Sequence, residues 1–432
     1  MSGVVGRTVG AGNEGYWPSP WPGEDAGPAR LQTASDRGSV GFAGAEVDVV
    51  FRQSIATTMA VLRKPGEVFV LGHTAGPEAI SWVERVDPRS LEVVGRSVDL
   101  PGGPTWPGGL AAHANGSLYV VFGQHAHRLD AELNLIASRE LPRHAPYNSF
   151  VILPDGHLVT KDFGGVLPGQ DASAHVASPT ELVVLEPDGL AIVARITLPE
   201  PSIARISASG DTVFVVGTTA LHRLVWDGTA LVLDDTFVAP YLQVDGQTYG
   251  WDPVIALDAV WFLDDGFGSE RYAGTFRGQG VNVAPLHLAR VGLLSGAVTL
   301  TEICGLPGGV VANPPLVDVE RRIVVGFDSG NGILVAFDVA DDGTCTERWR
   351  RDQNHASHLL LRADSGDLLT TDHDADAMSD VLVVLDIETG NERVRVPSGS
   401  PVQSVLFPAE GWDDDVYYCS FAGIARLSLR GR

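Results

Sequence analysis

The stretch TMAVLRKPGEVFVLGH (58–73) decides the fold, because two short runs of alternating apolar residues flank a turn that contains Pro and Gly. Such a pair of runs predicts a β-hairpin. The same pattern returns as GLAAHANGSLYVVFG (109–123), where the turn is Asn-Gly. Six further hairpins of this kind follow along the chain, over residues 149–163, 204–217, 253–266, 314–330, 357–374 and 404–423. A supersecondary unit that recurs at a nearly constant spacing indicates a repeat architecture.

A second hairpin follows each of the first seven, which gives units of four strands and about 47 residues. The eighth unit has only one further strand, GIARLSL (423–429), and VDVVFRQ (47–53) supplies the missing partner. No sustained helical periodicity accompanies these strands. We therefore predict an all-β fold, an eight-bladed β-propeller whose ring is closed by an N-terminal strand in the last blade. A seven-bladed ring with one hairpin misassigned is the alternative.

The chain divides into an irregular N-terminal arm, residues 1–46, and one propeller domain, residues 47–432. The arm contains YWPSPWPGED (16–25), which suits either packing on the ring or a lid over the channel. Its first residues lack a basic segment followed by an apolar one, so no export signal is expected. No apolar run is long enough for a membrane helix, and three scattered cysteines do not form a disulfide framework. These features predict a cytoplasmic protein.

The formal net charge is −24, from 54 acidic and 30 basic residues. A chain this acidic is repelled by nucleic acid and by anionic lipid, so we expect neither as a partner. The charge serves solubility in the first place, and it would also attract a cation or a cationic substrate.

Polar and aromatic residues gather in the loops at one mouth of the predicted channel. Loops that enter the first strand of a blade and loops that leave its second strand share one face, and His, Asp, Asn and aromatic side chains converge there. We take His373, His358 and Lys161 as candidate catalytic residues. His373 lies between two aspartates, which raise the pKa of a histidine when they are close. Trp106, Tyr147, Trp251 and His125 are candidates for substrate binding.

Clustered carboxylates are costly unless a cation neutralises them or one of them holds a proton, and hard oxygen ligands favour Ca²⁺ or Mg²⁺ over Zn²⁺ or Mn²⁺. The candidate ligands are Asp162, Asp264, Asn148, Asn313 and Asp374. The segment TTDHDADAMSD (370–380) resembles the start of a calcium loop but lacks the required glycine, so an acidic solvated loop is the competing interpretation. Lys161 either anchors a carboxylate substrate or pairs with Asp162.

Two turns, DIETGNE (386–392) and VDPRSLE (86–92), are similar to the turns of quinoprotein-like and YVTN-type blades within the β-propeller superfamily. The quinoprotein resemblance implies eight blades and a pyrroloquinoline quinone cofactor with calcium. The chain departs from it because the blade-ending Trp recurs clearly only at Trp349. The channel-mouth residues also resemble lactonase-type propellers, which hold a divalent ion there.

These patterns predict an enzyme that acts on a small-molecule substrate at the channel mouth, either a cation-assisted hydrolase of the lactonase kind or a lyase with a histidine acid or base. Two alternatives stay open: a non-catalytic propeller that binds a ligand or protein, and a quinoprotein-like oxidoreductase.

Overall fold

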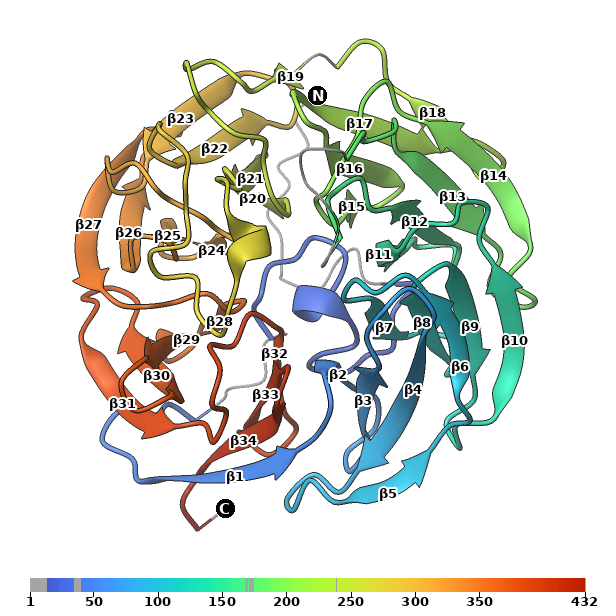
Figure 1. The fold of residues 1–432 in the computed structure, drawn as a ribbon, viewed down its shortest axis with the longest axis horizontal. Coiled ribbons are helices and arrows are strands. Elements are labelled where there is room, and N and C mark those ends of the chain that lie inside the picture. The colour runs from blue at the N-terminus through green and yellow to red at the C-terminus, as the bar shows by residue number, and fades with distance from the viewer. Residues whose placement is uncertain (1–13, 35–39, 168–169, 171–174, 238, 432) are drawn as a thin grey trace, which may run out of the picture.

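The computed structural model describes residues 14–34, 40–167, 170, 175–237 and 239–431. Eight antiparallel sheets stand around a central axis like blades, and the chain visits them in order around the ring (Figure 1). The protein is thus an all-β, eight-bladed propeller, as predicted. Within the described residues the only helical elements are two short 3-10 turns, η1 (Glu24–Ala26) and η2 (Ser269–Arg271).

Each blade begins with its innermost strand and ends at the rim. Blade 1 contains β2 (Thr57–Leu62), β3 (Val68–His73), β4 (Ala79–Val86) and β5 (Val93–Arg96), and blade 2 contains β7 (Gly109–Ala112), β8 (Leu118–Phe122), β9 (His125–Leu129) and β10 (Leu135–Glu140). Blade 3 contains β11 (Tyr147–Ile152), β12 (Leu158–Asp162), β13 (Glu181–Leu185) and β14 (Ile192–Thr197). Blade 4 contains β15 (Ser207–Ser209), β16 (Thr212–Val216), β17 (Ala220–Trp226) and β18 (Leu231–Leu233). Two short strands, β6 (Leu100–Gly103) and β19 (Ala239–Pro240), extend blades 1 and 4.

Blades 5 to 8 repeat this plan. Blade 5 contains β20 (Val254–Ala256), β21 (Ala259–Leu263), β22 (His287–Gly292) and β23 (Val298–Glu302), and blade 6 contains β24 (Leu316–Asp318), β25 (Ile323–Asp328), β26 (Ile333–Val339) and β27 (Cys345–Asp352). Blade 7 contains β28 (Leu360–Arg362), β29 (Asp367–Asp374), β30 (Ser379–Asp386) and β31 (Glu392–Pro397). Blade 8 contains β32 (Pro408–Glu410), β33 (Val416–Ser420) and β34 (Gly423–Leu429).

The ring closes through β1 (Val47–Gln53), which is the outermost strand of blade 8 and pairs with β34 from Val47 opposite Leu429 to Gln53 opposite Gly423. Both ends of the propeller domain therefore meet in one blade, and the sheet has no open junction. The closing strand has the bounds predicted from the sequence.

Burial explains why these segments form blades. The inner two strands of each blade are nearly all buried, and the third strand is buried at many positions, with residues such as Val61, Val120 and Val183 fully shielded from solvent. The outermost strands alternate between exposed and half-buried positions, as in β14. The apolar cores lie between adjacent blades, so each sheet is covered on both faces.

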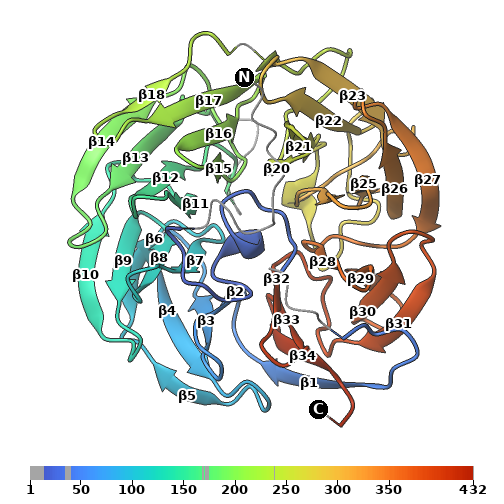
Figure 2. The ribbon, with the colours of Figure 1, turned by 180° about the vertical axis from the view of Figure 1, so that it is seen from behind.

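Residues 14–34 of the arm lie inside the channel instead of on the outer surface (Figures 1 and 2). Their backbone carbonyls accept hydrogen bonds from inner strands around the ring: Trp21 from Leu62, Pro22 from Ala112, Pro28 from Ala208, Ala29 from Ile255 and Gln32 from Leu361. Trp21 is fully buried in the core of blades 1, 7 and 8. Of the two expected outcomes, packing on the ring is thus the one observed, for this part of the arm. The remaining parts, residues 1–13 and 35–39, lie outside the described residues.

Candidate functional site at the channel mouth

The arm fills the centre of the channel with a buried ion network. Arg30 pairs with Glu24, and its Nη1 lies 2.9 Å from Asp25 Oδ2. Arg205, just before β15, reaches Glu24 Oε1 at 3.0 Å and approaches Asp252 Oδ2 at 3.8 Å. All five side chains are less than a tenth exposed. Charges buried this deeply require mutual neutralisation, which the arm and the ring supply to each other.

His358, a predicted catalytic residue, belongs to this network. Its Nδ1 lies 2.8 Å from Asp25 Oδ1, and its ring stacks on Phe407 with a centroid separation of 3.9 Å. Burial acts to raise the pKa of Asp25, but His358 and Arg30 outweigh it and hold that pKa below its ordinary value. The imidazole thus faces the chain's own arm, so an acid–base role toward a substrate would require the arm to move.

Lys161, at the end of β12, is fully buried below the mouth. Its Nζ lies 3.1 Å from the carbonyls of Asp162 and Ser202 and 3.4 Å from Asn148 Oδ1. Burial lowers the pKa of this lysine to about 7, against the raising effect of Asp162 and Asp252. Three oxygens for three ammonium protons make a complete structural site that ties blade 3 to the segment leading into blade 4. Its neighbour Asp162 pairs with Arg143 at 2.8 Å, so the expected pairing of Lys161 with the Asp162 carboxylate is replaced by a contact with its carbonyl.

Two of the four predicted substrate-binding residues come together at the mouth. Trp106 stacks on Phe163 at 4.2 Å, and Trp251 and Ile203 belong to the same apolar cluster. The Asn148 amide donates to the Ile203 carbonyl, which places this cluster beside Lys161. Tyr147 is buried between blades 2 and 3, and His125 bonds to the Gly102 carbonyl beside His127. The structure therefore collects Trp106, Trp251, Asn148 and Lys161 and leaves the other two apart.

Of the predicted metal ligands, Asn148 and Asp162 share blade 3, whereas Asp264, Asn313 and Asp374 belong to three other parts of the ring, and each is held by protein groups. Asp264 Oδ2 lies 2.8 Å from His287 Nδ1, and burial raises the pKa of Asp264 despite this partner. The Asn313 amide donates to the carbonyls of Ala356 and Val405. Asp374 caps an exposed turn by accepting from Asp376 and Ala377. Within the described ranges, no group of three or more His, Cys, Asp or Glu side chains is arranged to hold a metal ion.

His373, at the end of β29, is 8 % exposed. Burial lowers its pKa, although Asp372 and Asp374 act in the opposite direction. The two aspartates raise the pKa of His373, as predicted, but desolvation of the imidazolium outweighs their charge, so the net shift is downward. Across the sheet, His373 lies in register with Asp380 on β30.

The sequence analysis did not predict that the N-terminal arm supplies charged residues to the ion network in the channel. Glu24, Asp25 and Arg30 lie in a segment without strand periodicity, and nothing local assigns it to the channel. A usable signal was present, because three charged residues stand among Trp, Pro and Gly in an otherwise apolar stretch. Sequence reasoning also passed over Asp380, the last residue of the acidic segment, and the serines of SGSPVQS (398–404).

Neither a protein-family model nor a curated protein matches the chain. Solved structures do match in fold. BamB from Moraxella catarrhalis is 12% identical with a TM-score of 0.53, over 88% of this chain and 100% of that one. The quinohemoprotein alcohol dehydrogenase from Comamonas testosteroni is 10% identical with a TM-score of 0.62, over 95% and 80%. A europium-containing methanol dehydrogenase is 10% identical with a TM-score of 0.59, over 95% and 91%.

These likenesses show the β-propeller fold alone. The quinone and calcium ion that the quinoprotein resemblance implies do not fit the described channel, because Glu24, Asp25 and Arg30 occupy its centre and are already neutralised there. Among the described residues, no helix is long and apolar enough to cross a membrane.

Proposed function

We propose that this protein is a binding propeller that recognises a protein partner through its mouth loops. The observation that carries the proposal is the filled channel: the chain's own arm occupies the place where a channel-centred enzyme would hold its substrate. A rigid ring with an occupied centre offers its outer loops for recognition.

Exposed apolar side chains gather on the loops of blades 5 and 6 at the mouth. This mouth patch comprises Val244, Phe267, Val281, Val283 and Leu306, each more than a third exposed. Hydrogen bonds join the loops that carry it: Val281 N–H donates to the Phe267 carbonyl, and Gly308 N–H donates to the Asn282 carbonyl. Gly246 lies two residues after Val244, and a Cβ atom placed on it would be 3.6 Å from Val283 Cγ2. The loop that carries Val244 therefore lies next to Val283. Apolar side chains held together on a surface are typical of interaction sites.

The charges around the patch indicate the kind of partner. Asp245, Glu270 and Glu302 are exposed on or next to these loops, while Arg277 is paired with Asp352 at 2.8 Å. The whole chain carries a net charge of −24. A complementary partner therefore presents an apolar segment flanked by Lys or Arg, which the surrounding acidic surface attracts.

Peptide selection tests this proposal without a known partner. Random peptides displayed on phage are selected against the full chain, and the affinities of enriched peptides are measured by calorimetry. We expect apolar peptides with basic residues, bound at least about tenfold more weakly by the double variant Val281→Glu/Val283→Glu. Leu294→Glu is the matched control, because Leu294 is 95% exposed in the turn between β22 and β23, on the opposite face. No enrichment, or equal binding by all three proteins, would contradict the proposal.

Hydrolase or lyase activity stays a prediction. The grouping of Lys161, Asn148, Trp106 and Trp251 favours a small-molecule site at blades 3 and 4 as the second candidate. Hydrolysis assays against a lactone panel, with Lys161→Met beside wild type, test it: turnover that the substitution abolishes in a folded protein would support it, and no turnover would count against it.

A further inference from the structure

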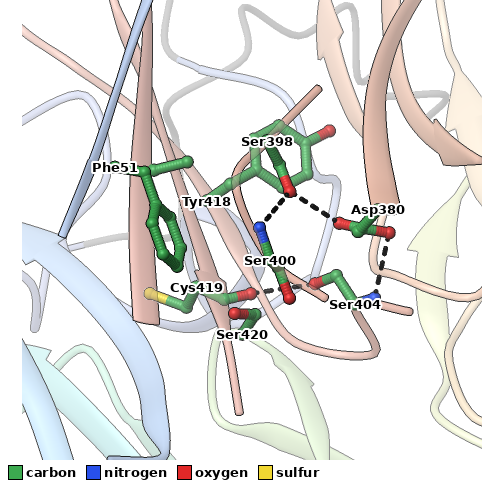
Figure 3. A pocket seen from close by; sticks show the side chains of 9 residues that line it. Phe51, Asp380, Ser398, Ser400, Ser404, Tyr418, Cys419 and Ser420 are labelled. Atoms are coloured by element: carbon green, nitrogen blue, oxygen red, sulfur yellow. Dashed lines mark hydrogen bonds between the residues drawn. The ribbon is translucent and has the colours of Figure 1, made fainter. Parts of the chain in front are cut away.

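A small cavity lies between blades 7 and 8, away from the channel and from the mouth patch. Its lining comes from β30, β33, β34, the closing strand β1 and the connection between β31 and β32 (Figure 3). The polar lining residues are Asp380, Ser398, Ser400, Ser404, Tyr418 and Ser420. The cavity offers ≈ 10 Å³ to the centre of a water molecule, so it holds one water or one ion of similar size.

The serine hydroxyls present lone pairs to this cavity because their protons are used elsewhere. Ser404 Oγ donates to the Cys419 carbonyl at 2.9 Å, and Ser400 Oγ donates to the Val402 carbonyl at 2.8 Å. Ser398 Oγ donates to Asp380 Oδ2 at 3.3 Å (Figure 3). A hydroxyl has one proton and two lone pairs, so each of these oxygens keeps accepting capacity after donating. The polar wall therefore attracts a cation or a donor and repels an anion.

Asp380 supplies a buried carboxyl group that has no positive partner when it is ionised. Its carboxylate is 1% exposed and accepts only two long hydrogen bonds, from Ser404 N–H at 3.2 Å and from Ser398. In the described part of the chain, no Lys, Arg or His forms an ion pair with it. The charged and titratable groups around it are Asp372, Tyr272, Tyr418 and its cross-strand neighbour His373. Burial raises the pKa of Asp380 to about 8, which shows how poorly the protein alone compensates this charge.

We propose that this cavity binds one monovalent metal cation, held by the Asp380 carboxylate and the hydroxyl oxygens of Ser398, Ser400 and Ser404. A single carboxylate with neutral oxygens balances one positive charge, whereas Ca²⁺ takes six to eight oxygen ligands with several carboxylates among them. Asp380 belongs to blade 7 and Ser404 leads into blade 8, so the ion joins the two blades where β1 closes the ring. This site is independent of the proposed recognition function.

Thermal unfolding of the full chain at pH 8 tests the site with three chloride salts at equal ionic strength: sodium, potassium and N-methyl-D-glucamine. Sodium or potassium is expected to raise the Tm by a few degrees over N-methyl-D-glucamine, since a ligand that binds only the folded state stabilises it. The variant Asp380→Asn should lose this difference. Asp376→Asn, an exposed aspartate of the same segment, should keep it.

Sodium-23 relaxation gives a second readout that does not depend on the stability of the variant. We expect wild type to broaden the sodium-23 signal. Loss of this broadening in Asp380→Asn, and a smaller broadening in Ser404→Ala, would support the site. Equal Tm values in the three salts, or a sodium effect that persists in Asp380→Asn, would overturn the proposal and leave a buried water in its place.

Discussion

Asp25 Oδ1 lies 2.8 Å from His358 Nδ1, which joins the N-terminal arm to the inner edge of blade 7 across 333 positions of sequence. Asp25 is fully buried and also bonds Arg30. The contact makes the arm part of the folded ring, because withdrawing it would leave His358 and the remaining charges of the network without partners in a buried channel.

The first prediction follows from this pair. Asp25→Ala leaves His358 buried without its carboxylate and takes one of two carboxylates from the buried Arg30, so we expect a loss of about 3–5 kcal/mol in the free energy of unfolding. Urea unfolding measures it. Asp341→Ala is the control, since Asp341 is fully exposed and its ion pair with Arg322 spans 3.6 Å, and it should cost less than about 1 kcal/mol. Equal losses in the two variants would show that the arm network contributes nothing beyond a surface ion pair.

The second prediction concerns pH and Asp380. Its folded-state pKa, about 8, is above the ordinary value of 3.8, so the folded state holds this proton more tightly than the unfolded chain. In buffer free of sodium and potassium, the contribution of Asp380 to stability is complete below pH 4 and is lost as the pH rises toward 8. Asp380→Asn should remove this slope and exceed wild type in stability at pH 8. If the stabilities of wild type and Asp380→Asn change in parallel with pH, this prediction is contradicted.

Lys161 gives the opposite slope in a different pH window. The folded-state pKa of Lys161, about 7, is below the ordinary value of 10.5. Between pH 7 and 10.5 the lysine is therefore protonated in the unfolded chain and neutral in the folded one. Lys161 thus makes the stability of the protein rise with pH over this range. Lys161→Met should flatten that rise and cost about 1–3 kcal/mol at pH 10, because the buried oxygens around Nζ lose the N–H groups that the neutral amine donates. Lys64→Met, at an exposed position, should keep the wild-type profile from pH 7 to 10. If the stability of Lys161→Met depends on pH in the same way as that of wild type, a group other than Lys161 causes the rise.

Ring closure depends on a close approach at Gly423. A Cβ added there would meet the Arg52 carbonyl oxygen at 2.3 Å and the Phe51 ring at 2.8 Å, so β1 could not keep its register with β34. We expect Gly423→Ala to lower the free energy of unfolding by about 2–3 kcal/mol. In Gly95→Ala the new methyl meets its nearest neighbour at 3.8 Å, and the variant should stay within about 1 kcal/mol of wild type. Unchanged unfolding of Gly423→Ala would show that β1 closes the ring in another register.

The blades could be predicted because each one is a local pattern. The hairpin turns and alternating runs lie within one stretch of chain, and the incomplete last unit required the strand 47–53. The interior could not be predicted in the same way. The partners of His358 and Arg205 lie in the arm, and periodicity says nothing about where a segment without regular structure goes.

The candidate site was only partly predictable for a related reason. Strand direction places Lys161, Asn148, Trp106 and Trp251 near one mouth, and the structure does bring them together. Strand direction does not tell whether a carboxylate is already paired. Asp162 and Asp264 are held by Arg143 and His287, whereas Asp380 has no cationic partner among the described residues.

Hydrogen–deuterium exchange of the full chain tests the central claim, the arm-filled channel, most directly. The amides of Leu62, Ala112, Ala208, Ile255 and Leu361 donate to carbonyls of the arm. If the arm occupies the channel in solution, these five amides and peptides covering 14–34 exchange as slowly as the second strands of the blades. Rapid exchange of the arm together with these five amides, while the second strands stay protected, would show an open channel and contradict the account.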